Sequence, residues 1–244
     1  MLTKRTQRIV LSSIFIFSLW PFFNVPVQAD NLLYALDFSR IDRIRPLSWL
    51  TDLGFTAEKD MNVPGGIKLS AGDGVLVLQT DKPAFGMLMN KQVHLNNPQT
   101  IELQWGVDTY PAASSWRQGV NREAIMVILF FGDQVPADRF YLPDLPRFLG
   151  LFLCDEDYGN NTFYGKSYTK TGRYICLDSP PLNRTIVSNF DIEKNFRRIF
   201  HTDQVPPITG IGLEVDTSNL TDGRASAHIQ SLKIFRKEVQ TSDN

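Results

Sequence analysis

Two carboxylates on one face of a strand are the first candidates for chemistry in this sequence. Glu214 and Asp216 are separated by one residue in GLEVD, which has the alternating pattern of a strand. Alternate strand residues point to the same face, roughly 7 Å apart. Glycosidases hold two carboxylates about 5 to 9 Å apart across a cleft, so Glu214 and Asp216 are candidate catalytic residues. A solvated acidic sheet surface is the alternative interpretation.

The segment CDEDYGNNTFYGKSYTKTGRYIC runs from Cys154 to Cys176 and contains both cysteines of the chain. In an oxidising compartment two such cysteines are expected to pair, and closing a loop of this size stabilises the fold by about 3 kcal/mol in the chain-entropy model. The flanking stretches GLFLC and YICLD have the composition of strands that meet across a hairpin. The sequence therefore predicts a Cys154–Cys176 disulfide, with a reactive thiol or unpaired buried cysteines as the alternatives.

Metal binding is restricted by the available ligands. A cysteine site lacks further Cys ligands, and the three histidines lie far apart without ligand spacing. Asp155 and Asp157 are calcium candidates together with loop carbonyls, because calcium takes clustered oxygen ligands. A solvated acidic loop tip is the competing interpretation, since the EF-hand spacing is absent. We therefore expect no required cofactor, with calcium as the candidate ion.

Aromatic residues in polar segments indicate a possible ligand site. Tyr158, Tyr164 and Tyr168 lie between the cysteines, and Trp116 follows YPAASS in a connection. A ring face can stack on the C–H groups of a sugar while neighbouring Asn, Asp and Arg side chains bind its hydroxyls. These four residues are the candidate glycan contacts. The alternative is that the rings fold back and cap the open end of the domain.

Apolar residues alternate with period two along most of the chain, which predicts strands. The run AIMVILFFG is apolar at nearly every position, so its strand should be covered on both faces. Broken alternation in the last strand predicts a β-bulge near Gln230 or Ser231. One short helix is expected late, in FDIEKNFRRIF, with Asn189 as N-cap and Phe196 and Phe200 in its buried stripe. Together these features predict an all-β fold, a jelly-roll-like antiparallel β-sandwich.

The N-terminus has the parts of a signal peptide: a basic start, an apolar stretch and a small-residue exit that ends at Ala29. The apolar stretch is shorter than the ~20 residues that span a bilayer, so no stable membrane span is expected after cleavage; a retained anchor is the alternative. We expect a signal peptide at 1–29, a sandwich domain at 30–237 and a flexible tail at 238–244. Such a protein is periplasmic or extracellular.

The segments IELQWGVDTYP, AIMVILFFGD, NFDIEKNFRRIF and GIGLEVDTSNLTDGRASAHIQSLKIF resemble an uncharacterised family of secreted bacterial proteins known only as a domain of unknown function. The resemblance covers about 38–235 and implies a lectin-like or carbohydrate-module-like β-sandwich in an exported protein. It implies no activity. Where that family tends to have an acidic pair, this chain has Asn121, Arg122 and Glu123, so an acid-dependent role there is not implied.

Three functions are compatible with these features. The chain has 25 Lys and Arg against 26 Asp and Glu, a net charge of -1, which argues against nucleic acid as a partner. A non-catalytic glycan-binding module is the favoured hypothesis. A polysaccharide hydrolase or lyase on the same scaffold and a structural envelope protein without a small ligand are the alternatives. A sheet face lined by carboxylates and rings favours the first two. The sequence does not specify an oligomeric state.

Overall fold

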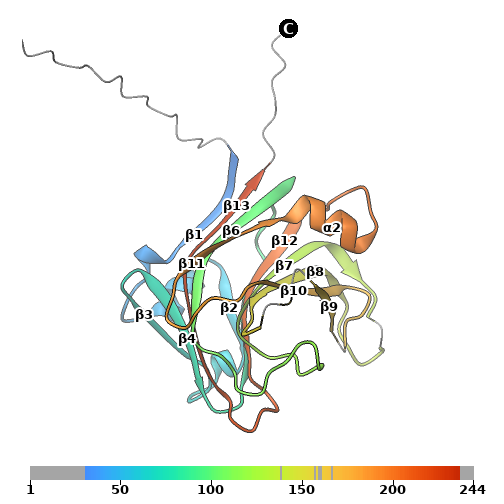
Figure 1. The fold of residues 1–244 in the computed structure, drawn as a ribbon. Coiled ribbons are helices and arrows are strands. Elements are labelled where there is room, and N and C mark those ends of the chain that lie inside the picture. Colours follow the sequence, from blue (N-terminus) through green and yellow to red (C-terminus); the bar gives the residue numbers. More distant parts are fainter. Residues whose placement is uncertain (1–30, 138, 157, 159–160, 166, 237–244) are drawn as a thin grey trace, which may run out of the picture.

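The computed structural model of the protein describes residues 31–137, 139–156, 158, 161–165 and 167–236. The predicted signal peptide and tail lie outside these residues. Most of the described chain forms two sheets (Figure 1). Sheet A contains β1 (Leu32–Asp37), β3 (Lys68–Gly72), β4 (Val75–Asp81), β6 (Pro98–Thr109), β11 (Ile186–Asp191) and β13 (Arg224–Arg236). Sheet B contains β2 (Phe55–Lys59), β5 (Phe85–Asn90), β7 (Glu123–Val135), β8 (Leu145–Leu153), β9 (Thr162–Tyr164), β10 (Gly172–Asp178) and β12 (Ile208–Asp216).

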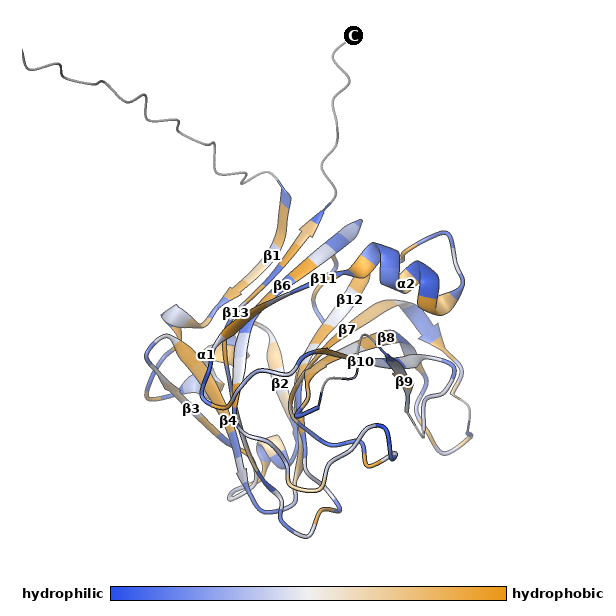
Figure 2. Ribbon diagram, in the orientation of Figure 1, coloured by the Kyte–Doolittle hydropathy of each residue, from blue (hydrophilic) through white to orange (hydrophobic). Residues whose placement is uncertain are grey.

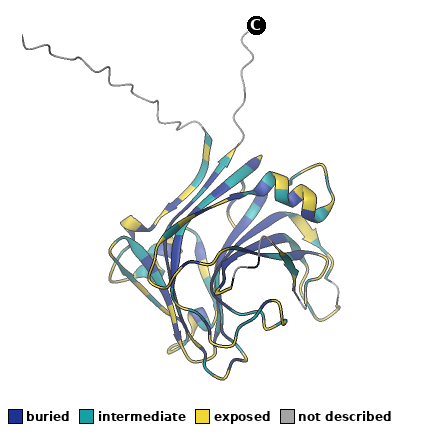
Figure 3. Ribbon diagram, viewed as in Figure 1, coloured by how far each residue is buried: buried dark blue, intermediate teal, exposed yellow. Residues whose placement is uncertain are grey.

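The two sheets pack face to face around one apolar core. Sheet A has the order β11-β6-β13-β4-β3 with β1 on β13, and sheet B has the order β2-β5-β12-β7-β8-β10-β9. Trp105 of β6, Val127 of β7 and Leu213 of β12 are fully buried between them. The buried positions follow the strands, and the exposed ones concentrate in the connections (Figure 3). The structure confirms the predicted all-β sandwich.

Strand β7 lies in the middle of sheet B and is buried from Glu123 to Phe131. Ile125, Val127 and Leu129 belong to the core between the sheets. Met126 and Ile128 belong to a second buried cluster on the outer face of sheet B, the face turned away from sheet A. Figure 2 shows the apolar colour along the middle of β7, between hydrophilic ends. The prediction that this strand is covered on both faces is therefore correct.

The last strand contains the predicted bulge. Along the pairing of β13 with β6 the register shifts between Ile229 and Ser231. Ile229 and Leu232 are both fully buried although they are three residues apart, because the extra residue returns the side chains to the core face. The N-terminal part of β13 pairs with β4, and the part after the bulge pairs with β1.

Helix α2 (Ile192–Phe200) is the late helix that the sequence predicts, but its N-cap differs. Asp191 caps it by accepting a hydrogen bond from the Lys194 amide at 2.8 Å. Asn189 remains extended because it pairs with Glu102 in sheet A.

A second helix, α1 (Pro46–Asp52), is not predicted by the sequence pattern, since it is only seven residues long and buries only Leu50. Two 3-10 turns, η2 (Phe38–Arg40) and η3 (Asp60–Asn62), complete the elements. Within the described ranges, no helix is long and apolar enough to cross a membrane.

The predicted disulfide is present, with 5.9 Å between the Cα atoms of Cys154 and Cys176. The hairpin expected between its flanking strands is wrong. Strands β8 and β10 are parallel neighbours, with Cys176 opposite Phe152. The intervening chain crosses back and contributes β9, which pairs antiparallel with β10. Parallel neighbours need a long connection, and the segment between the cysteines supplies it.

We expect Phe196→Ala to lower the free energy of unfolding by about 3 kcal/mol or more. Phe196 is fully buried and its ring lies 4.6 Å from the rings of Phe131 and Phe200, so truncation leaves a cavity between α2 and sheet B. Chemical denaturation measures the change, with the exposed Arg198→Ala on the same helix as control. Equal midpoints for the Phe196 variant and the wild type would contradict the packing.

Candidate functional site

Three carboxylates meet on the outer face of sheet B. Glu214 and Asp216 lie on β12, where their neighbours Leu213 and Val215 are buried in the core between the sheets. Because side chains alternate along a strand, Glu214 and Asp216 point to the outer face. On β7, Glu123 is the pairing partner of Asp216, and the register shift there places it beside both carboxylates. The predicted pair is thus brought together, and a third carboxylate joins it.

Burial controls the charge of this group. Glu123 is only 3% exposed, and its burial raises its pKa well above the ordinary value, an effect that the charges of Glu214 and Asp216 increase. Burial, followed by the charge of Asp216, raises the pKa of Glu214 to about 8. A hydrogen bond links the carboxyls of Glu123 and Glu214. Both raised pKa values favour the protonated carboxyls at neutral pH.

Asp216 has the cationic partner. Arg122 Nη1 lies 3.2 Å from Asp216 Oδ2, and both side chains are largely buried. The Ser218 amide donates to Asp216 Oδ1 at 2.8 Å. Burial still raises the pKa of Asp216, although the Ser218 hydrogen bonds and Arg122 oppose that change. Arg122 also donates to the Ser218 carbonyl, which fixes the guanidinium next to the carboxylate. This ion pair holds one negative charge at the edge of the face.

A wall of aromatic rings adjoins the carboxylates. Trp116 stacks on Phe152 with 4.4 Å between ring centroids and lies 5.1 Å from Tyr174. Burial and the charges of Glu214 and Glu123 raise the pKa of the Tyr174 phenol, so this ring lies next to the carboxylates. Gly150 permits the packing, because a Cβ there would meet Met126 Sδ at 2.5 Å and Tyr174 Cδ1 at 2.9 Å.

The four predicted glycan contacts do not form one site. Trp116 and Tyr158 are buried members of the second cluster, which includes the aromatic wall. Tyr168 is partly buried against this cluster, with its ring 6.2 Å from that of Phe148. Tyr164 is 61% exposed. Trp116 and Tyr158 thus occupy the capping position that the alternative interpretation describes. A sugar contact by any of the four stays a prediction.

Tyr164 lies on the other face of sheet B. In the pairing of β9 with β10, Tyr164 is opposite Arg173, and Phe163 is opposite Tyr174. Directly paired residues share a face and successive residues alternate, so Tyr164 and Arg173 point away from the aromatic wall. The Arg173 guanidinium lies 4.1 Å from the centre of the Tyr164 ring.

The calcium prediction is not tested. Asp155 is exposed as a residue, although the partial burial of its carboxyl raises its pKa. Asp157 lies outside the described residues. Among the described side chains, no group of three or more His, Cys, Asp or Glu is placed to hold a metal ion. The arrangement on the outer face therefore involves carboxylates, one guanidinium and rings.

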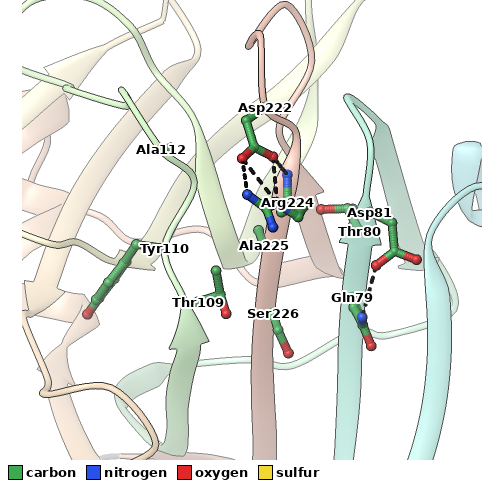
Figure 4. Close-up of a pocket in the computed structure, with 10 residues that line it drawn as sticks. All are labelled: Gln79, Thr80, Asp81, Thr109, Tyr110, Ala112, Asp222, Arg224, Ala225 and Ser226. Atoms are coloured by element: carbon green, nitrogen blue, oxygen red, sulfur yellow. Dashed lines mark hydrogen bonds and ion pairs between the residues drawn. The ribbon is translucent and has the colours of Figure 1, made fainter.

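A polar pocket of about 330 Å³ lies on sheet A, at the ends of β4, β6 and β13 (Figure 4). Its charged side chains bind one another: Arg224 Nη2 lies 2.6 Å from Asp222 Oδ2, and Gln79 donates to Asp81 at 3.0 Å. The charged groups of this pocket therefore already have hydrogen-bond and ion-pair partners within the protein.

Comparisons with known proteins found no matching family model and no matching curated protein. The resemblance to the uncharacterised secreted family therefore stays a prediction. Solved structures with some likeness include the carbohydrate recognition domain of Emp47p, at 14% identity and a TM-score of 0.47, with 86% of this chain and 99% of that chain covered.

Two other solved structures show weaker likeness. The VIP36 exoplasmic/lumenal domain, in a Ca2+/Man3GlcNAc-bound form, has 10% identity and a TM-score of 0.40 over 78% of this chain and 86% of that chain. The xyloglucanase domain of NopAA from Sinorhizobium fredii has 9% identity and a TM-score of 0.42 over 75% and 93%. At these values the likenesses carry no argument about this chain.

We expect the folded protein to lose stability as the pH rises from about 4.5 toward 8. Folding raises the pKa of Glu214 from 4.5 to about 8, so across this window the native chain keeps a proton that the unfolded chain has released. The stabilisation from this proton is complete below about pH 4.5. Above that pH, the free energy of unfolding falls by up to about 1.4 kcal/mol per pH unit until the folded-state pKa of about 8 is reached.

Denaturant midpoints at about pH 5 and about pH 8 measure this loss. The double substitution Glu123→Gln with Glu214→Gln should reduce the pH dependence, because neither amide titrates. Glu102→Gln, on sheet A, is the control for removal of a carboxylate; that residue pairs with Lys233 at 2.9 Å. A pH dependence that is the same in the wild type and the double variant would show that folding does not raise the pKa values of this carboxyl pair.

Proposed function

We propose that this protein binds a glycan on the outer face of sheet B. The observation that carries the proposal is the position of Glu214 and Asp216, two partly buried carboxyls beside a wall of aromatic rings. Sugars present hydroxyls at their edges and C–H groups on their faces. Carboxyls and rings held side by side on a rigid sheet are complementary to both.

The two carboxyls have different parts in this proposal. Asp216, which is charged and held by Arg122, accepts hydrogen bonds from sugar hydroxyls. Glu214, whose raised pKa favours the protonated form at neutral pH, can both donate and accept hydrogen bonds. Tyr168 is partly buried at the border of the wall and offers a ring to the sugar. Trp116 and Tyr158 support that surface from within.

We also propose that the protein acts in the periplasm or outside the cell. The Cys154–Cys176 disulfide supports this location, because disulfides persist in oxidising compartments and are rare in the cytosol. The basic and apolar composition of the N-terminal segment supports it independently. Both features agree with a ligand that belongs to the cell envelope or to an extracellular polymer.

A polysaccharide hydrolase is the second candidate function. A carboxyl with a pKa of about 8 is protonated at neutral pH and can act as a general acid, which favours Glu214 in that role. Glu123 cannot be the second catalytic group, because its hydrogen bond to Glu214 leaves no room for a substrate between them. Asp216, two residues along β12, would be the base that activates water.

Affinity electrophoresis of the purified protein against a panel of neutral and acidic polysaccharides tests the binding proposal. We expect one polysaccharide to retard the wild type and Asp216→Asn to weaken that binding about tenfold or more, because a charged hydrogen bond contributes about 1.5 to 3 kcal/mol. Glu102→Gln should bind like the wild type. Retardation that both variants leave unchanged would place the binding elsewhere.

Release of reducing ends from the retained polysaccharide separates the two candidate functions. For a hydrolase, the wild type releases reducing ends and Glu214→Gln stops release while retardation persists, since the amide cannot donate the proton. For a binding module, retardation occurs without release in either protein. Absence of both retardation and release across the panel would reject both functions in favour of a structural protein.

A further inference from the structure

A cluster of two arginines and two rings lies on the core-facing side of sheet B, where α2 ends. It consists of Arg147 on β8, Arg173 on β10, Tyr164 on β9 and Phe200 at the end of α2. We call it the arginine–ring site. Strands β8, β10 and β9 are successive neighbours in the sheet, and α2 lies close to them in Figure 1. The site shares no residue with the carboxylate group.

Both guanidinium groups lie against the same ring. The Cζ atom of Arg147 is 5.5 Å from the centre of the Phe200 ring, and that of Arg173 is 5.3 Å from it. Arg173 also lies 4.1 Å from the centre of the Tyr164 ring. Cation–π contacts orient the two groups, but they do not neutralise the charges. Two positive charges are therefore held at one place by the fold.

No described carboxylate forms an ion pair with Arg147 or Arg173. On the adjoining helix, by contrast, Arg197 is paired with Glu193 at 2.8 Å. Arg173 Nη1 donates to the carbonyls of Thr169 and Gly172 at 2.7 Å, and Nε is buried without a hydrogen-bond partner among the described residues, so Nη2 is the nitrogen that a ligand can reach. Buried or partly buried positive charges are normally paired, whereas the described residues supply no carboxylate partner here, so an anionic ligand would complete the site.

An arginine fork matches the geometry of an oxyanion. The planar guanidinium offers two parallel N–H groups to the two oxygens of a carboxylate or a sulfate, which a lysine ammonium does not. Two neighbouring guanidinium groups can bind one oxyanion together, or they can bind two oxyanions that follow one another along a polymer. The chemistry of the site therefore selects negatively charged oxygen groups.

Tyr164 adds a surface for a sugar. It is 61% exposed on a strand that is paired with β10, so its backbone is fixed by the sheet while most of the side chain faces solvent. Arg173 contacts the ring at 4.1 Å and leaves the rest of it free to stack on the C–H face of a pyranose. A charged group and a sugar face are thus recognised by adjacent side chains.

We propose that the arginine–ring site binds a glycan that carries carboxylate or sulfate groups. The inference goes beyond the binding proposed for the outer face, because it uses the opposite side of sheet B. Arg147 and Arg173 bind the oxyanion, Tyr164 stacks on the sugar, and Phe200 positions both guanidinium groups. An acidic polysaccharide, with charge and sugar repeated along one chain, is the class of ligand that fits.

Isothermal titration calorimetry of the purified protein with dextran sulfate and with unsulfated dextran tests the inference. These polymers share one sugar backbone and differ in the sulfate. We expect binding of dextran sulfate alone, weakened at least about fivefold by Arg147→Gln or Arg173→Gln and abolished by the double substitution. Arg40→Gln removes the same charge from an exposed position after β1 and should change the affinity less than about twofold.

Two further variants keep the test decisive if the glutamine variants unfold. Arg147→Lys keeps the charge and loses the two parallel N–H groups, so binding should fall while the melting temperature changes little. Tyr164→Ala should weaken dextran sulfate but leave the binding of polyphosphate, a polyanion without sugar, unaltered. Loss of binding that is equal in Arg40→Gln and the site variants, or no binding of dextran sulfate at low salt, would overturn the proposal.

The same variants distinguish this site from the outer face. Asp216→Asn should bind dextran sulfate like the wild type, and the double arginine variant should keep any retardation by a neutral polysaccharide. If the arginines matter only for folding, the melting temperature falls and the affinity of the remaining folded protein is unchanged. Polyphosphate that binds as tightly as dextran sulfate, whether or not Tyr164 is present, would overturn the sugar part of the assignment.

Discussion

Strand β7 has apolar side chains on both of its faces, and each face must be removed from water for the strand to lie in the middle of sheet B. Sheet A covers one face. The chain covers the other with its own rings: Trp116 comes from a loop, Phe152 from β8 and Tyr174 from β10. Each buried ring contributes on the order of 2 kcal/mol through the apolar area it removes from water. The Cys154–Cys176 bridge holds the connection that supplies Tyr158 and Tyr168 to the same surface.

The carboxylates stand where this second core ends. Glu123 is the first residue of β7, so it begins the apolar run and is buried with it. A carboxyl at such a border has little water around it, and the nearby Arg122 pairs with Asp216 and cannot neutralise all three groups. Protonation of Glu123 and Glu214 avoids buried negative charge that Arg122 does not compensate. The aromatic cover and the unusual protonation are therefore two consequences of the same burial.

Periodicity in the sequence predicted much of the fold. It identified β7 as a strand covered on both faces, the bulge in β13 and the late helix, and it placed Glu214 and Asp216 on one face. It missed α1, the N-cap at Asp191 and the parallel pairing of β8 with β10, because pairing depends on contacts between distant segments. Glu123 joined the site for the same reason: ninety residues separate it from Glu214, and only the register of β7 with β12 unites them. Its one local signal was a charge at the start of an apolar run.

The roles of the tyrosines depend on strand register. Phe163 and Tyr164 are neighbours, as are Arg173 and Tyr174, and β9 and β10 align them so that Phe163 meets Tyr174 on one face while Tyr164 meets Arg173 on the other. A shift of one residue would exchange the two faces. From composition alone, the rings of this segment are equivalent. In the sheet, Tyr174 lies in the aromatic wall beside the three carboxylates, whereas Tyr164 is exposed to solvent in the arginine–ring site. The two faces of one sheet thus differ in chemistry: one has protonated and ion-paired carboxyls beside buried rings, and the other has two guanidinium groups beside an exposed ring.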